Sequence, residues 1–173
     1  PLYSSAASDV YKRQVKIVPT WPASKILWIK RNEPDVFKKV YKYLLVEDYL
    51  IYRMTGEFVA EGSLLCSTVY WNIISKRWWD EMLDFLSISA DQLPDIRESG
   101  EDVGEIRHPV ASELKLSSKT IVSTGALDQA AGAIGVGNIQ LGIFSENTGA
   151  ALAVCATLKK PVFDRLGRMP IHY

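Results

Sequence analysis

Cysteine is scarce in this chain of 173 residues, which contains only Cys66 and Cys155. Neither of the two belongs to a CxxC or CxxH spacing, so the pattern excludes a structural zinc site. Two thiols so far apart are typical of small buried side chains in a reducing compartment. The sequence also lacks a signal-peptide pattern, and we therefore expect the protein in the cytoplasm.

An excess of charge is also lacking, because 20 basic residues balance 20 acidic ones. Without a net positive charge, long-range attraction to nucleic acid or to an anionic membrane is not expected. No apolar run approaches the roughly 20 residues that a membrane span needs. Hydrophobic residues make up 47% of the chain and charged residues 23%, which indicates a folded domain and excludes disorder for most of the chain.

The beginning of the chain differs from the rest. Its residues 4–14, SSAASDVYKRQ, match the translation of a common transposase sequencing adapter at all eleven positions. The alternative is an ordinary polar tail, which so complete a match disfavours. We therefore treat residues 1–14 as an artefactual, disordered tail. The chain ends at MPIHY without a helix stop, so we expect residues 15–173 to be an internal fragment.

Patterns in the first half of the chain predict helices separated by short breaks. A helix beginning at Pro22 is ended by Pro34, which opens a second helix with apolar residues on one face. A third helix is ended by Gly56, and residues 78–86 form another amphipathic segment. Residues 91–99 are expected to be a loop.

The second half changes character. Residues 120–125, TIVSTG, predict a buried strand, and DQAAGAIGVG predicts a helix of small residues packed against a sheet. IFSENTGAALAVCA predicts a β-hairpin that turns near residues 147–149. Strand, helix and hairpin in this order indicate α/β architecture, with a domain boundary near residues 137–142.

Asp128 is the most informative candidate for chemistry. It follows the predicted strand and opens the predicted helix, where the helix dipole stabilises a carboxylate. A carboxylate at the carboxyl end of a strand can accept a proton from a hydroxyl group. The alternative is a helix N-cap without a further role. SENTGA, residues 145–150, could offer N–H groups and a hydroxyl to phosphate, or it could be a plain turn.

Other motifs are weaker. The glycines do not form G-x-G-x-x-G, and G-x-x-x-x-G-K-[ST] is missing, so neither a dinucleotide fingerprint nor a P-loop is indicated. His108 and His172 are isolated and are interpreted as surface residues. The five tryptophans could stack on sugars, but core packing is the stronger interpretation.

Three stretches together resemble the FGGY family of carbohydrate kinases, most closely its xylulokinase-like members. PASKILWIKRNEP (residues 22–34) resembles the family's N-terminal signature, and LLVEDYLIYRMTGEF (residues 44–58) resembles its Leu-Leu-x-x-Asp-Tyr-Leu block. TGALDQAAGAIGVG (residues 124–137) resembles the block that carries the catalytic aspartate. Xylulokinases usually have Gly-Gly-Gly-Asp-Asn there, whereas this chain has Gly-Ala-Leu-Asp-Gln, and glycerol kinases tend to carry the Gln.

The resemblance implies an α/β fold of the actin/hexokinase-like (ribonuclease H-like) ATPase type, here incomplete. By match, Asp128 would be the general base and Gln129 would contact substrate hydroxyls. Thr148 and Gly149 would lie in the family's Gly-Thr-Ser-Gly phosphate loop, in which Asn147 replaces the usual glycine. ATP would be the cofactor with Mg²⁺ accompanying the nucleotide, and no metal is assigned to protein side chains.

The resemblance further implies ATP-dependent phosphorylation of a pentulose, D-xylulose to D-xylulose 5-phosphate. Alternatives are another sugar or polyol kinase, acting on ribulose, glycerol or erythritol, or a non-catalytic actin-like nucleotide-binding protein. Residues 15–138 would be the C-terminal part of the kinase N-terminal domain, and residues 139–173 the start of its C-terminal domain. The partners would be the sugar and ATP, and a homodimer of the whole protein is possible. Since the first phosphate loop and the adenosine site lie outside it, we expect this chain alone to be inactive and to fold poorly.

Overall fold

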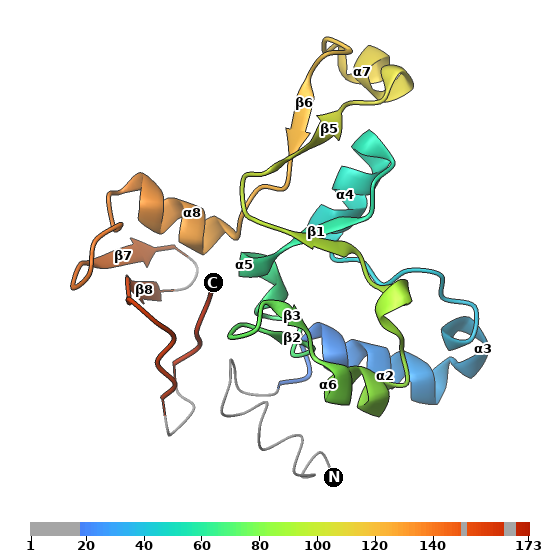
Figure 1. Ribbon diagram of the computed structural model, residues 1–173, viewed down its shortest axis with the longest axis horizontal. Coiled ribbons are helices and arrows are strands. Elements are labelled where there is room, and N and C mark those ends of the chain that lie inside the picture. Colours follow the sequence, from blue (N-terminus) through green and yellow to red (C-terminus); the bar gives the residue numbers. More distant parts are fainter. Residues whose placement is uncertain (1–17, 150–151, 165–168) are drawn as a thin grey trace.

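The computed structural model describes residues 18–149, 152–164 and 169–173 (Figure 1). The segment 4–14, for which an adapter origin is predicted, lies outside the described residues. Among the described residues, no helix has the length and hydropathy to cross a membrane.

Short helices and strands alternate along the chain (Figure 1). In chain order they are α2 (Pro22–Asn32), α3 (Pro34–Phe37), α4 (Val46–Thr55), β1 (Val59–Glu61), α5 (Gly62–Leu65), β2 (Trp71–Asn72), β3 (Arg77–Trp78), α6 (Asp80–Leu86), the 3-10 helix η1 (Ala90–Gln92), β4 (Asp95–Arg97), β5 (Asp102–Glu105), α7 (His108–Leu114), β6 (Ile121–Ser123), α8 (Asp128–Gly135), β7 (Phe144–Thr148) and β8 (Leu152–Ala156). This mixture of helices and strands agrees with the predicted α/β class.

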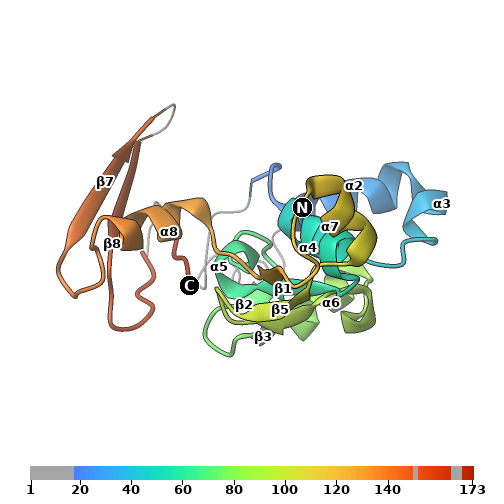
Figure 2. The same cartoon turned by 90° about the horizontal axis from the view of Figure 1, so that it is seen from above.

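The strands pair two by two in the described part of the chain. β1 runs parallel to β4, whereas β2–β3, β5–β6 and β7–β8 are antiparallel pairs. Figure 1 shows a central body from which β5, β6 and α7 project in one direction and α8 with the β7–β8 hairpin in another, and in Figure 2 the hairpin part again stands to one side of the body. The loop from β6 to α8 therefore lies where the hairpin part joins the body.

The first core forms between α2 and α6. Helix α2 begins with Pro22, which suits the first helical position, and buries Ala23 and Ile26 on one face. Against this face lie Met82 and Leu86 of α6. The helix predicted from Pro22 is confirmed, whereas the segment predicted at 78–86 becomes helical only from Asp80, because Trp78 pairs in β3.

The helix predicted after Pro34 is wrong beyond its first turn. Helix α3 ends at Phe37, and residues 40–45 have no regular structure. Contacts with the 91–93 segment replace the helical bonds: Tyr43 N–H donates to the Gln92 carbonyl at 2.8 Å, and Lys42 Nζ donates to the Leu93 carbonyl at 2.7 Å. These tertiary contacts outweigh a helical pattern that has only marginal intrinsic stability.

Helix α4 confirms its prediction, since it ends at Gly56 in the left-handed conformation with φ 92°. It packs with β1, α7 and β6 around a second core that includes Ile51, Val59 and Val122. A third core lies under α5 and β2 and is centred on Leu65, Cys66 and Trp71. Both cysteines are free thiols; Cys66 is buried as expected, whereas Cys155 in the β8 strand is only partly buried.

Three further expectations need correction. The predicted loop at 91–99 contains the end of η1 and the strand β4, because residues 95–97 pair with β1. Strand β6 is only partly buried: Val122 faces the second core, but Ile121 is 49% exposed because β6 pairs with β5 alone. Helix α8 lies against strand β7, as the predicted packing on a sheet requires, but none of its residues is buried in the described structure, so this packing is looser than predicted.

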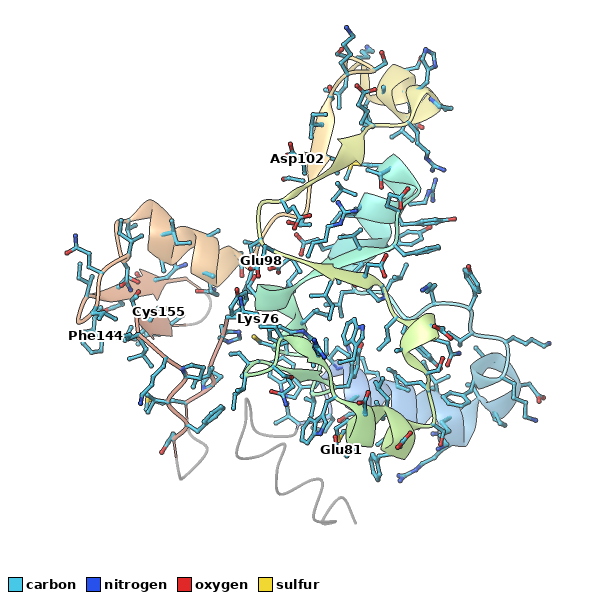
Figure 3. All side chains as sticks on the ribbon, in the orientation of Figure 1. Lys76, Glu81, Glu98, Asp102, Phe144 and Cys155 are labelled. Atoms are coloured by element: carbon cyan, nitrogen blue, oxygen red, sulfur yellow. The ribbon has the colours of Figure 1, made fainter. Side chains whose placement is uncertain are left out.

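The predicted hairpin is confirmed, with β7 and β8 paired from Phe144↔Ala156 to Thr148↔Leu152. Its turn comes later than expected, because Asn147 and Thr148 still belong to β7. Apolar side chains of the hairpin stay exposed, among them Phe144 at 71%, which points outward in Figure 3.

Candidate active site at the start of helix α8

The loop between β6 and α8 is held tightly at its beginning. Thr124 is completely buried, and its Oγ1 donates to the Glu98 carbonyl at 2.8 Å and accepts the Glu101 N–H at 3.1 Å. Gly125 follows with φ 73°, a conformation that glycine adopts without steric cost. Its carbonyl accepts the Gly100 N–H at 3.0 Å. These hydrogen bonds fix the direction in which the chain leaves β6 toward α8.

Asp128 is the first residue of α8, as the sequence predicts. Its side chain is exposed, and its Oδ1 accepts the Gln129 N–H at 2.7 Å. The helix dipole favours negative charge at this position. Because the side chain is exposed, its second oxygen is accessible to a hydroxyl group, so the geometry suits a proton acceptor.

Gln129 lies beside Asp128 and is partly buried. Its Oε1 is shielded from solvent and has no hydrogen-bond partner among the residues that the structure describes. A shielded acceptor without a partner is costly, which makes this atom available to a ligand hydroxyl. This feature agrees with the expected contact between Gln129 and substrate, which stays a prediction.

A buried polar junction supports the residue before Asp128. Leu127 N–H donates to Ser63 Oγ at 2.8 Å, and Ser63 lies in α5 next to the end of β1. Ser63 Oγ in turn donates to the Glu61 carboxylate at 2.6 Å. Sequence reasoning missed both Glu61 and Ser63. The only signal is local, because EGS after an apolar strand is a plausible helix start.

Two further acidic residues, Glu47 and Asp48, lie in α4, and Glu47 reaches the loop between β6 and α8. Glu47, at the start of α4, places its Oε1 so close to Gly125 that a Cβ there would clash with it. Burial, followed by the charges of Glu61 and Asp48, raises the pKa of Glu47 to about 7. Burial likewise raises the pKa of Asp48 to about 6. Neither residue was predicted as part of the site.

Thr148 and Gly149 lie apart from Asp128. Both are exposed at the end of β7, and Figure 2 shows β7 and β8 extending away from α8. In the described residues no hydrogen bond joins them to Asp128 or Gln129. A Cβ at Gly149 would meet nothing within 4 Å and Thr148 is exposed, so both residues are open to solvent, and their role in holding phosphate stays a prediction. The structure therefore does not bring the two halves of the predicted site together.

The end of the chain lies against the body close to the same region. Tyr173 donates from its hydroxyl to Glu98 Oε2 at 2.7 Å, and Lys76 bridges to Glu98 Oε1 at 3.1 Å and contacts the Tyr173 hydroxyl. Figure 3 shows Lys76 and Glu98 side by side. Tyr173 N–H also donates to Cys66 Sγ at 3.1 Å. Lys76, Glu98 and Tyr173 line a cavity of about 210 Å³, together with Gly62 and Trp71.

No group of three or more His, Cys, Asp or Glu side chains with metal-binding geometry occurs in the described ranges.

Comparison with known proteins identifies the family. Residues 5–135 match the model of the N-terminal domain of the FGGY family of carbohydrate kinases. The chain is 39% identical over 134 residues to the xylulose kinase of Bacillus subtilis, covering 78% of this chain and 26% of that protein. It is 37% identical over 123 residues to the xylulose kinase of Escherichia coli, covering 71% of this chain and 25% of that protein.

A solved structure agrees with these relatives. The ligand-bound xylulose kinase from Lactobacillus acidophilus superposes with a TM-score of 0.91 at 26% identity, covering 96% of this chain and 34% of that one. The chain thus has part of the actin/hexokinase-like ATPase fold that these kinases share, and it belongs to the FGGY family of carbohydrate kinases. It spans about a quarter of the length of the curated relatives that it matches.

Proposed function

We propose that the whole protein transfers a phosphoryl group from ATP to a hydroxyl group of a sugar, and that the sugar is the pentulose D-xylulose. Membership of the family and the similarity to xylulose kinases support the substrate class. The observation that carries the proposal is the placement of Asp128, an accessible carboxylate at the start of α8 whose loop is held by buried polar contacts.

In the proposed reaction the oxygen of the sugar hydroxyl attacks the γ-phosphorus of ATP while Asp128 accepts the hydroxyl proton. The bond between this phosphorus and the β,γ-bridging oxygen breaks, and ADP leaves. Gln129 offers its shielded Oε1 to a neighbouring hydroxyl and so orients the sugar. Phosphoryl transfer has a loose transition state, and positioning of the two reactants therefore supplies most of the rate enhancement. Thr148 and Gly149 would hold phosphate oxygens, and Mg²⁺ accompanying the nucleotide would neutralise their charge.

The roles proposed for Asp128 and Thr148 bear on the activity of this chain alone. Since it spans about a quarter of its relatives and keeps Asp128 apart from Thr148, we propose that it has no kinase activity alone. The domain boundary at residues 138–139, the cytoplasmic location and a homodimer of the whole protein stay predictions.

The proposal is tested by Asp128→Asn in the whole protein, with ATP and a panel of D-xylulose, D-ribulose, glycerol and erythritol. Asparagine keeps the size and a hydrogen-bonding oxygen but is a very weak base, so kcat should fall by about 10²- to 10⁴-fold while sugar binding is retained. Asp80→Asn is the matched control, because Asp80 is also the exposed first residue of a helix, α6. Turnover of the Asp128 variant close to wild type would refute the role of the carboxylate, and preference for glycerol would refute the substrate.

A further inference from the structure

The contact between Ser63 and Leu127 joins parts of the chain that are 64 positions apart in sequence. Leu127 is the N-cap residue of α8, immediately before Asp128. Ser63 is 1% exposed and belongs to α5, which follows directly on β1. Ser63, which belongs to α5 in the central body, therefore contacts the backbone of the residue immediately before Asp128.

The direction of each hydrogen bond in this junction follows from its chemistry. A backbone N–H can only donate, so Ser63 Oγ accepts from Leu127. The hydroxyl has one proton, and an ionised carboxylate can only accept. Ser63 consequently gives its proton to Glu61, whose Oε1 and Oε2 lie 2.6 and 2.8 Å from Ser63 Oγ. The carboxylate thus keeps the lone pairs of the hydroxyl turned toward Leu127.

Glu61 is itself immobilised on all sides. It is 1% exposed, and its oxygens accept the N–H groups of Ser63 and Leu64 at 2.8 and 2.7 Å. The Ser99 hydroxyl donates to Oε2 as well. A buried carboxylate with this many donors is satisfied, so it forms a rigid support rather than a reactive group.

We propose that Ser63, oriented by Glu61, is a positioning residue that sets the place of Asp128 for proton transfer. This inference rests on the proposed function, because it gives a role to Ser63 only through the carboxylate of Asp128. Without the hydroxyl, the Leu127 N–H loses its partner and the first turn of α8 can shift. Misplacement of a reacting group by about 1 Å costs on the order of 10²-fold in rate.

The first test is Ser63→Ala in the whole protein, compared with Ser67→Ala. Ser67 lies in the turn after α5 and donates only to the Leu64 carbonyl at 2.8 Å, so its variant loses a hydroxyl of the same region without touching Leu127. Ser63→Ala should lower kcat by about 10- to 100-fold, whereas KM for the sugar changes less than about threefold. Ser67→Ala should keep kcat within about twofold. Equal kcat for the two variants would overturn the proposal.

A double variant separates positioning from general damage. If Ser63 acts through Asp128, then adding Ser63→Ala to Asp128→Asn should lower kcat by less than about twofold further. Full additivity of the two effects would refute action through Asp128. Wild-type turnover of Asp128→Asn alone would refute the proposed function instead, and the two failures are therefore distinguishable.

Glu61→Gln is an independent test of the orienting role of Glu61. It remains applicable if the Ser63→Ala variant does not fold. Glutamine keeps the shape of Glu61, but it replaces one of the two carboxylate oxygens that accept from Ser63 by an NH₂ group, which can only donate. We expect a loss of kcat in the same direction and faster amide exchange in a peptide covering residues 124–130. Unchanged kcat and exchange in this variant would contradict the orienting role of Glu61.

Discussion

Replacing Asp48 by Asn should stabilise helix α4 at neutral pH and leave its stability unchanged near pH 4. Asp48 is 2% exposed, and its Oδ2 accepts the Leu45 N–H at 2.8 Å at the start of the helix. Burial is the main cause that raises its pKa from 3.8 to about 6, opposed by the Leu45 hydrogen bond and assisted by the charge of Glu61. Asparagine retains a hydrogen-bonding oxygen but carries no charge to desolvate.

Proton linkage makes the Asp48 carboxyl group destabilising at neutral pH. A carboxyl group with a raised pKa binds its proton more tightly in the folded state, so its contribution to stability is fully present below about pH 4 and is lost as the pH rises through about 6. At about 1.4 kcal/mol per pH unit, the difference between 3.8 and about 6 amounts to about 3 kcal/mol. The Asp48→Asn variant is spared this loss.

Amide hydrogen exchange in peptides of α4 measures the effect in the whole protein, with wild type and variant compared at the same pH. At pH 7.5 the variant should exchange up to about 100-fold more slowly, and at pH 4 the two should agree within about threefold. Asp35→Asn is the control, because the side chain of Asp35 is 88% exposed and lies outside α4, so exchange in the peptides of α4 should stay as in wild type. Faster exchange of the Asp48→Asn variant at pH 7.5 would refute the raised pKa.

Two further predictions concern the loop and the hairpin. Gly125→Ala introduces a Cβ that clashes with Glu47 Oε1 at a residue with φ 73°, so we expect a loss of about 1–3 kcal/mol in stability and a lower melting temperature than for Gly132→Ala in α8, where a Cβ meets nothing within 4 Å. Asn138 is 4% exposed, donates to Ser145 Oγ at 2.9 Å and accepts from Thr157 Oγ1 at 2.9 Å. Asn138→Ala should therefore destabilise the hairpin by about 2 kcal/mol, measured as faster exchange in β7 while α4 is unaffected; equal exchange in β7 would contradict this role.

Local signals account for what the sequence predicted well. Pro22 at the start of α2, Gly56 at the end of α4 and the turn-forming residues 147–149 of the hairpin are local signals. The same holds for Asp128, because a β-branched strand followed by small residues places it at the start of α8. Such features depend on propensity, capping and period, which a single sequence displays.

Long-range contacts account for what it could not predict. The helical pattern after Pro34 is real, but its continuation pairs with residues 91–93, and nothing local announces that competition. Ser63, which is hydrogen-bonded to Glu61, likewise reaches Leu127 only because α5 lies next to the β6–α8 loop. Their pattern is also that of an ordinary helix start.

The two predicted halves of the site are held by different parts of the molecule. Asp128 is fastened to the body through Leu127 and Ser63, whereas the strand that carries Thr148 is fastened through Asn138 at the far end of α8. A substitution that removes the Ser63 contact should therefore leave the Asn138 contacts intact, and the reverse should also hold. In the whole protein Ser63→Ala should lower kcat without raising KM for ATP, and Asn138→Ala should raise KM for ATP more than it lowers kcat. Parallel changes of both constants in both variants would show that the two halves respond as one rigid unit.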